Sequence, residues 1–305
     1  MRKLLKALWR IITFPFVLVF KIITFPFRAI RDANRFINAE PEEGQPLIDS
    51  ISNLVTESQA RASLWDHIEA LRMHLLRMVI GLAIGVGISF YFTQNIIGIL
   101  AGPVGGLKKL IAIEVTESIG VFMRVALLSG IAMALPYMAF ELWLFVAPGL
   151  RPREKKFGLV GIPIAAVLFL TGMAFCYFIL LPSALKFLLD FMGIHAQLRP
   201  NSYFSFVTGL MFWIGISFEF PLVIYVLTLM GFVKPQILAQ QWRIAVVIIS
   251  IVAAAVTPTV DPVNMGLVMI PMILLYFISI GLSYIAYAGR SKRAEQANET
   301  ESSTG

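Results

Sequence analysis

The residue with the strongest chemical signal is Glu219, an acid in the middle of a long apolar stretch. An acid at the centre of a membrane helix costs about 2.5–3.5 kcal/mol, so it normally has a partner, a water-filled cavity or a protonated carboxyl. Pro221 lies two residues later and removes a backbone hydrogen-bond donor, which would leave a carbonyl oxygen free near the acid. Glu219 is therefore either a polar docking or proton-linked site, or a carboxyl that a neighbouring helix binds for packing alone.

Three other acids carry weaker signals. Glu141 lies nearer the end of an apolar stretch, beside Trp143, and is expected to reach the membrane interface. Asp261 lies in a short link, where it either caps the following helix or has a functional role. Glu154 lies in a basic loop, where an acid is usually a solvated salt-bridge partner but could also bind a cationic ligand.

The sequence contains none of the patterns that support catalysis. His67, His74 and His195 are too scattered for a metal site, and no glycine-rich phosphate loop is present. No arrangement of serine, histidine and aspartate can be proposed, and no paired aspartates lie in the apolar stretches. The sequence therefore predicts a protein that is not an enzyme and has neither a cofactor nor a metal.

The composition indicates the class of protein that must position these acids. Of 305 residues, 58% are hydrophobic and 14% are charged, and the mean hydropathy is +0.81. A soluble domain has about 45–50% apolar and about 25% charged residues, so a soluble globule is excluded, as are disordered and fibrous chains. The net charge of +7 comes mostly from loops and tails beside apolar stretches, which favours membrane topology and anionic lipid contact over nucleic acid. We predict an all-α membrane protein.

The apolar stretches predict six membrane spans, approximately at residues 78–100, 121–147, 157–185, 203–230, 244–256 and 264–284. The last two are predicted to be short. At about 1.5 Å per residue the fifth reaches only about 20 Å, against a hydrocarbon core of about 30 Å. A short helix implies tilt or a locally thinned bilayer.

Two glycines in the first predicted span have a spacing that is typical of helix contacts. Gly81 and Gly85 lie four residues apart, so both would occupy one face of a helix. They either let another helix approach closely or reflect the ordinary use of glycine in membrane helices.

The basic residues predict the orientation of the chain. Six spans place both termini on one side, and most lysines and arginines lie in the loops and tails of that side. This side is therefore predicted to be cytoplasmic. We expect a multi-pass protein of the cell membrane with both termini in the cytoplasm.

The chain outside the spans divides into three parts. Residues 1–37 carry a repeated basic and aromatic motif, at 10–16 and again at 21–27, which predicts an amphipathic helix lying in the headgroup layer. A seventh span over Leu8–Phe27 is the alternative, opposed by Lys21 and two prolines. The domain prediction is thus an interfacial extension, a linker, a six-span domain and a disordered tail, at residues 1–37, 38–62, 63–289 and 290–305.

Five motifs occur in order between residues 63 and 288. They are His67-Ile-Glu-Ala-Leu-Arg72, Trp143-Leu-Phe-Val-Ala-Pro-Gly-Leu150 followed by Arg-Pro-Arg-Glu-Lys-Lys156, Gly172-Met-Ala-Phe-Cys-Tyr-Phe178, Ser217-Phe-Glu-Phe-Pro221, and the series Thr257-Pro258, Asp261-Pro262 and Ile270-Pro-Met272. Together they resemble the TatC subunit of the twin-arginine protein translocase. Any one motif alone would be weak, whereas five in the family's order are a specific signal.

The chain departs from the family pattern at two motifs. The glutamate of the first motif falls on Ala70, and Glu69 lies one residue earlier, about 100° around a helix. Either contact by this segment is lost or Glu69 provides it. A glutamine that often follows the Asp-Pro link is replaced by Met265, and the link itself is one residue longer than the commoner form.

The resemblance implies a receptor for the twin-arginine signal peptides of folded export proteins. Such proteins recruit single-span TatA/TatB-like subunits for transport driven by the proton-motive force, and self-association is expected. By resemblance Glu154 would contact the signal peptide, and Glu69 and Arg72 would contribute by proximity. Glu219 with Pro221 would form the docking site for partner helices within the membrane.

Four further residues are given structural roles. Pro103, Phe145 and Tyr177 match family positions that shape a membrane-facing hollow and the outer cap, and Asp261 lies in the outer link. For Pro103, Phe145 and Tyr177, a packing role is the favoured interpretation.

The alternative to a translocase receptor is a proton- or cation-coupled secondary transporter with Glu219 as its coupling site. The small number of charges within the spans argues against that alternative, as does the lack of an obvious inverted repeat.

Overall fold

A computed structural model describes residues 58–149, 152–190, 198–257 and 262–304. Within these ranges the chain forms helices and no β-strand. The interfacial extension at 1–37 and most of the linker at 38–62 lie outside the described residues, as do Asp261 and His195.

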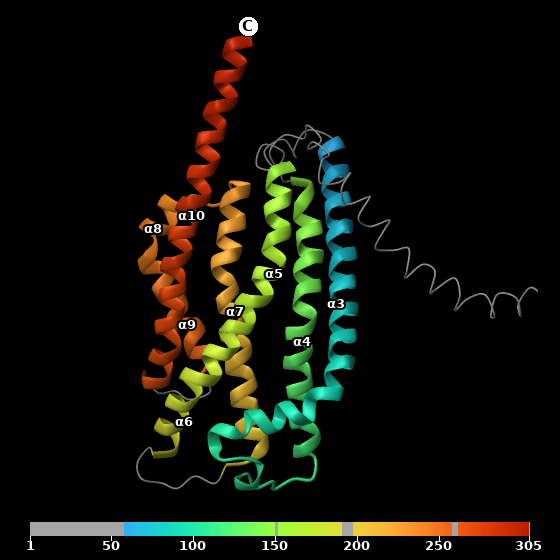
Figure 1. The fold of residues 1–305 in the computed structure, drawn as a ribbon, viewed down its shortest axis with the longest axis vertical. Coiled ribbons are helices and arrows are strands. Elements are labelled where there is room, and N and C mark those ends of the chain that lie inside the picture. The colour runs from blue at the N-terminus through green and yellow to red at the C-terminus, as the bar shows by residue number, and fades with distance from the viewer. Residues whose placement is uncertain (1–57, 150–151, 191–197, 258–261, 305) are drawn as a thin grey trace, which may run out of the picture.

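The fold is an elongated bundle of helices (Figure 1). Its α-helices are α3 (Ser58–Leu100), α4 (Glu117–Val146), α5 (Pro152–Phe175), α6 (Leu181–Asp190), α7 (Pro200–Met230), α8 (Pro235–Gln240), α9 (Trp242–Val256) and α10 (Pro262–Thr304). Short 3-10 turns lie at η1 (Gly102–Val104), η2 (Leu107–Lys109) and η3 (Ala147–Gly149), and a π-helical segment, η4 (Cys176–Leu180), joins α5 to α6.

Five segments of the described chain are long and apolar enough to cross a membrane: His67–Val104, Glu117–Val146, Gly158–Leu189, Pro200–Met230 and Pro262–Ala288. They correspond to five of the six predicted spans. The fifth predicted span is the shorter apolar helix α9. The expectation that the last span is short was wrong, because the apolar part of α10 has 27 residues.

The beginning of α3 and the end of α10 lie at the same end of the bundle, together with the end of α4 and the beginning of α5 (Figure 1). We call this the inner end and the opposite end, which carries η1, η2 and α6, the outer end. The names follow the predicted orientation, which stays a prediction.

The termini of the membrane domain differ from the sequence prediction in two places. Helix α3 begins at Ser58, so residues 58–62 are helical rather than part of a linker. Helix α10 continues to Thr304 and projects beyond the bundle, where a disordered tail was expected (Figure 1). The tail contains alanine, glutamate, glutamine and lysine, which favour helix once a preceding helix removes the cost of nucleation.

Close glycine contacts hold α3 against α4. A Cβ atom added to Gly130 on α4 would lie 2.6 Å from the Cα atom of Val86, and one added to Gly85 would lie 2.8 Å from the carbonyl oxygen of Gly130. The ring of Tyr137 similarly covers Gly81, where it occupies the space that a Cβ atom would need. Of the two interpretations of the Gly81 and Gly85 pair, the close helix approach is therefore confirmed.

The centre of the bundle is an apolar core at the crossing of α4, α7 and η4. Its fully buried members include Val125, Phe204, Val207, Ile214 and Cys176. The core joins the outer halves of the long helices, so polar groups at the two ends are held in fixed positions relative to each other.

Candidate functional site

A buried polar cluster joins α3 and α4 near the inner end. The Glu141 carboxylate lies 2.7 Å from His74 Nδ1 and accepts a hydrogen bond of 2.8 Å from the Tyr137 hydroxyl. The Arg77 Nη1 atom lies 3.8 Å from the same carboxylate. Glu141 is only 4% exposed, so the prediction that it reaches the membrane interface was wrong. Its partners on both helices satisfy the acid within the bundle instead.

Phe145 contacts the same part of α3. Its ring centroid lies 4.8 Å from that of His67 and 6.1 Å from that of His74. Phe145 thus lies at the inner end, where it packs the last turn of α4 against the first part of α3. It is not a component of the outer cap.

The three residues proposed for signal-peptide contact have different environments. Glu69 and Arg72 form an exposed ion pair of 3.7 Å on α3, with side chains 62% and 75% exposed. An exposed pair of this kind contributes about 0.2–1 kcal/mol, so both groups remain free to exchange partners. Glu154 lies in the first turn of α5, and its side chain is outside the described part of the structure. The first turns of α3 and α5 lie at the same end of the bundle (Figure 1).

Glu219 lies on α7 where α5 approaches closely. A Cβ atom on Gly172 of α5 would lie 3.0 Å from the Cα atom of Gly215 on α7, so the two backbones nearly touch one turn from the acid. The Oε1 atom of Glu219 is buried and has no hydrogen-bond partner among the described residues. Pro221 is buried within the same helix, which continues through it to Met230. The sequence therefore located an acid at membrane depth that the described part of the chain leaves incompletely bound.

Two of the family positions lie at the outer end. The Tyr177 hydroxyl donates a hydrogen bond of 2.8 Å to the carbonyl oxygen of Ile99, the penultimate residue of α3. Pro103 lies in the 3-10 turn η1 that follows α3. Tyr203 of α7 donates similarly to the Leu100 carbonyl, at 2.6 Å. These bonds bind carbonyl groups that the end of α3 leaves without helical partners.

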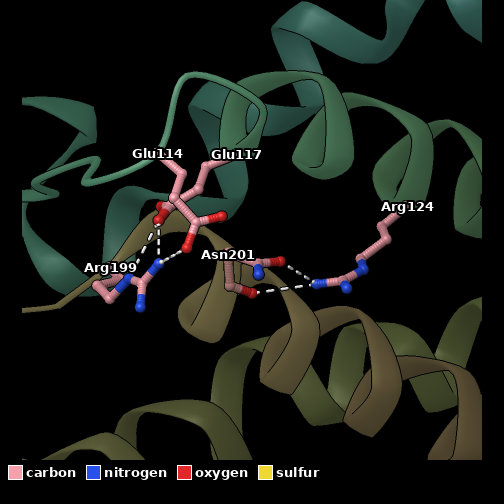
Figure 2. Close-up of polar contacts among 5 residues, drawn as sticks. All are labelled: Glu114, Glu117, Arg124, Arg199 and Asn201. Carbon is pink, nitrogen blue, oxygen red and sulfur yellow. Dashed lines mark hydrogen bonds and ion pairs between the residues drawn. The ribbon is translucent and has the colours of Figure 1, made fainter.

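A cluster of ion pairs at the outer end was not found from the sequence. Arg199 binds Glu117 and Glu114, with 3.0 Å between its Nη2 atom and Glu114, and Arg124 donates a hydrogen bond of 2.6 Å to the side chain of Asn201 (Figure 2). The hydrogen bonds to Glu117 and Glu114 raise the pKa of Arg199 above its ordinary value, because they favour the charged guanidinium. Glu117 is separated from Arg199 by 82 residues, so no local pattern links them.

The described residues contain no cluster of three histidine, cysteine, aspartate or glutamate side chains able to hold a metal ion. They present an exposed acid and arginine at the inner end, a buried glutamate with partners on α3 and α4, and a buried carboxylate oxygen within a candidate membrane span.

The family profile and the related proteins that match this chain point to the same protein family. The sequence profile of the family "Sec-independent protein translocase protein (TatC)" matches residues 66–271. The chain is 35% identical to the TatC protein of Carboxydothermus hydrogenoformans over 221 residues, which cover 72% of this chain and 91% of that protein. It is 34% identical to the TatC protein of Deinococcus radiodurans, over 74% of this chain and 87% of that protein.

The fold is also similar to that of a solved structure from this family. A crystal structure of the twin-arginine translocase receptor TatC superposes with a TM-score of 0.65 at 36% sequence identity. The superposition covers 72% of this chain and 99% of the other. The family profile begins at residue 66, so it does not cover the N-terminal extension.

Proposed function

Because the chain belongs to the TatC family of Sec-independent protein translocases, we propose that it is the receptor subunit that binds twin-arginine signal peptides. As a member of that family it is a multi-pass membrane protein and a component of the Tat translocase. The finer proposal concerns which residues receive the peptide and the partner subunits.

The observation that carries the proposal is the placement of acids at the inner end. Glu69 is exposed and only weakly paired, and the first turn of α5, which contains Glu154, lies at the same end (Figure 1). An arginine guanidinium is always charged and presents a planar set of donors that matches carboxylates. Two adjacent arginines therefore need two acids on one surface, and Glu69 and Glu154 are the pair we assign to them.

Ala70 supports the role of Glu69. It occupies the position where the family motif has an acid, and it is half-buried, whereas Glu69 is turned to solvent. Glu69 precedes Ala70 by one residue, so its side chain points about 100° away from that of Ala70 around the axis of α3. We assign Arg72 to positioning, because its weak ion pair orients Glu69 while leaving that acid free to exchange partners.

We further propose that Glu219 recruits the single-span TatA/TatB-like subunits. A buried carboxyl oxygen without a partner is costly in lipid, and a polar side chain on an incoming helix would remove that cost. Pro221 has no backbone N–H, so it leaves a carbonyl oxygen of α7 near the acid without its usual helical partner. In this proposal the proton-motive force drives transport. The protein lies in the cell membrane with both termini in the cytoplasm.

Photo-crosslinking to a signal peptide tests the receptor role. Glu69→Gln and Glu154→Gln should each weaken crosslinking to a twin-arginine peptide and abolish it together, while the protein still inserts in the membrane. A peptide with two lysines instead of two arginines should crosslink poorly to the unsubstituted chain. Equal crosslinking of both peptides, or no loss in the double variant, would remove these acids from the site.

A further inference from the structure

An apolar edge faces away from the bundle at the outer end, on the segment between η2 and α4. Ile111, Ile113 and Val115 are 50%, 71% and 96% exposed. Leu110, which has extended backbone, packs against the core instead. All of residues 111–116 are exposed, and the large apolar side chains among them are those of Ile111, Ile113 and Val115. We call them the outer apolar edge.

Two contacts hold this segment to Leu198 and Arg199, the residues directly before α7. Glu114 lies between two residues of the edge and binds Arg199 at 3.0 Å, and Figure 2 shows its side chain pointing toward that guanidinium. The backbone N–H of Ile111 donates a hydrogen bond of 3.1 Å to the Leu198 carbonyl. These contacts tie the segment to the residues before α7, while the three residues of the outer apolar edge stay exposed.

The edge continues the lipid-facing surface of α4. Val115, Ile119, Met123 and Leu127 are spaced by four residues and are 96%, 68%, 49% and 47% exposed. Val115 lies in the turn directly before α4, and Ile119, Met123 and Leu127 lie on one face of this helix. The last three belong to the membrane span Glu117–Val146, so their exposed side chains face lipid. The edge therefore begins where that lipid contact ends.

The charges beside the edge are basic. Lys108 and Lys109 end η2, directly before the edge, and both are exposed. The acid within the segment, Glu114, is bound by Arg199. Apolar side chains flanked by lysines are the combination that binds an anionic headgroup layer.

We propose that the outer apolar edge inserts into the headgroup layer of the leaflet at this end of the bundle, with Lys108 and Lys109 contacting anionic lipid headgroups. The segment would then anchor the start of α4 in the membrane rather than form a hydrated loop. The ion pair of Arg199 with Glu114 presents the edge, because it turns the acid of this segment toward the protein and keeps its negative charge away from lipid.

Spin labels measure the depth of the edge directly. The single cysteine of the chain, Cys176, is fully buried, and Cys176→Ala provides the background. Ile113→Cys and Val115→Cys are labelled with a nitroxide in full-length protein, in nanodiscs of phosphatidylcholine and phosphatidylglycerol. Collisions of each label with oxygen, which concentrates in lipid, are compared with collisions with a water-soluble nickel chelate. Met123→Cys is the lipid reference, and Ser302→Cys, in the part of α10 that projects beyond the bundle, is the water reference.

We expect the oxygen-to-nickel collision ratio at both edge positions to shift from the Ser302 value toward the Met123 value. A ratio equal to that of Ser302 would mean a hydrated loop and would overturn the proposal. Shielding from both reagents would also overturn it, because it would mean that protein, such as a second copy of this chain, covers the edge.

A second measurement tests the lysines separately. Removing phosphatidylglycerol should lower the collision ratio at Ile113→Cys, and the Lys108→Gln, Lys109→Gln double variant should lose this dependence on lipid charge. If the oxygen-to-nickel collision ratio does not change with lipid charge when both lysines are present, the lysines do not contact anionic headgroups. None of these readouts involves signal peptides, so failure here is distinguishable from failure of the receptor function.

Discussion

At the scale of single residues, Glu141 is a carboxylate whose removal should destabilise the protein. Glu141→Ala leaves His74 Nδ1 and the Tyr137 hydroxyl without their acceptor. Losing its partner costs a buried group about 1–3 kcal/mol, and the main cost is expected at His74 because Tyr137 is 42% exposed. Thermal unfolding in detergent should show a lower Tm for Glu141→Ala and a smaller decrease for Glu141→Gln, which keeps one acceptor oxygen. Leu142→Ala, at the exposed neighbouring position, is the matched control. An unchanged Tm in Glu141→Ala would contradict the role of this cluster.

In contrast to Glu141, Glu219 should matter for partner binding and transport rather than for stability. Because its Oε1 atom has no partner among the described residues, Glu219→Ala should cost little or no stability. The same variant should lose copurification of a TatA-like partner and transport of a folded reporter, while signal-peptide crosslinking is retained. Phe220→Ala, at the adjacent exposed position, is the control. A large loss of Tm with normal transport would favour the packing interpretation of this acid.

The contrast between these two acids explains what sequence reasoning found at this scale. Glu219 was identifiable because an acid inside a long apolar stretch is a local anomaly. Glu141 lies in a similar stretch, but its partners His74 and Arg77 are on another helix, and nothing local links them. A histidine and a glutamate at the ends of adjacent predicted spans were the available signal, and it requires knowledge of which spans pack together.

At the scale of elements, the contact between α3 and α4 depends on Gly130. Gly130→Ala would place a Cβ atom 2.6 Å from the Val86 Cα atom, which is backbone and cannot rotate away. The two helices must separate, and overpacking of this kind costs about 1–3 kcal/mol. Gly87→Ala on α3 has nothing within 4 Å of the added atom and should leave Tm unchanged. Equal Tm values for the two variants would show that the helices can shift without cost.

The outer ion pairs should control the mobility of the segment they bind. Arg199→Gln removes the charge that Glu114 and Glu117 share, so residues 110–117 should exchange amide hydrogens faster while the inner end is unaffected. Arg124→Gln, which breaks only the contact to Asn201, should change exchange in this segment less. Hydrogen exchange followed by mass spectrometry measures both. No change in Arg199→Gln would mean that the single backbone bond to Leu198 suffices.

The positions of the helices could be predicted from the sequence more completely than the contacts between helices. Hydropathy located five spans and the short α9 because each is a local property of the chain. The continuation of α10 to Thr304 was missed because a polar composition suggests disorder when the helix that precedes it is ignored. The pairing of Arg199 with two acids was missed because it joins residues far apart in the chain, and only the fold brings them together.

At the scale of the whole molecule, the side of the membrane on which the C-terminus lies depends on whether the short helix α9 crosses. With five crossings the two ends of the membrane domain would be on opposite sides, but the beginning of α3 and the end of α10 lie at the same end of the bundle (Figure 1). We therefore expect α9 to cross as well, although its 15 residues reach only about 22 Å at about 1.5 Å per residue. We then expect the bilayer beside α9 to be thinner than the usual hydrocarbon core of about 30 Å.

Reporter fusions and lipid length test this arrangement together. Green fluorescent protein fused after Gly305 should fluoresce, since it folds in the cytoplasm, and alkaline phosphatase inserted in the 110–116 segment should be active, since it requires the opposite side. Lipids with longer acyl chains should lower Tm through mismatch at α9, and four extra leucines within α9 should reduce that sensitivity. An inactive C-terminal fluorescent reporter would mean that α9 does not cross, whereas Tm values independent of acyl-chain length would mean that hydrophobic mismatch at α9 does not limit the stability of the protein.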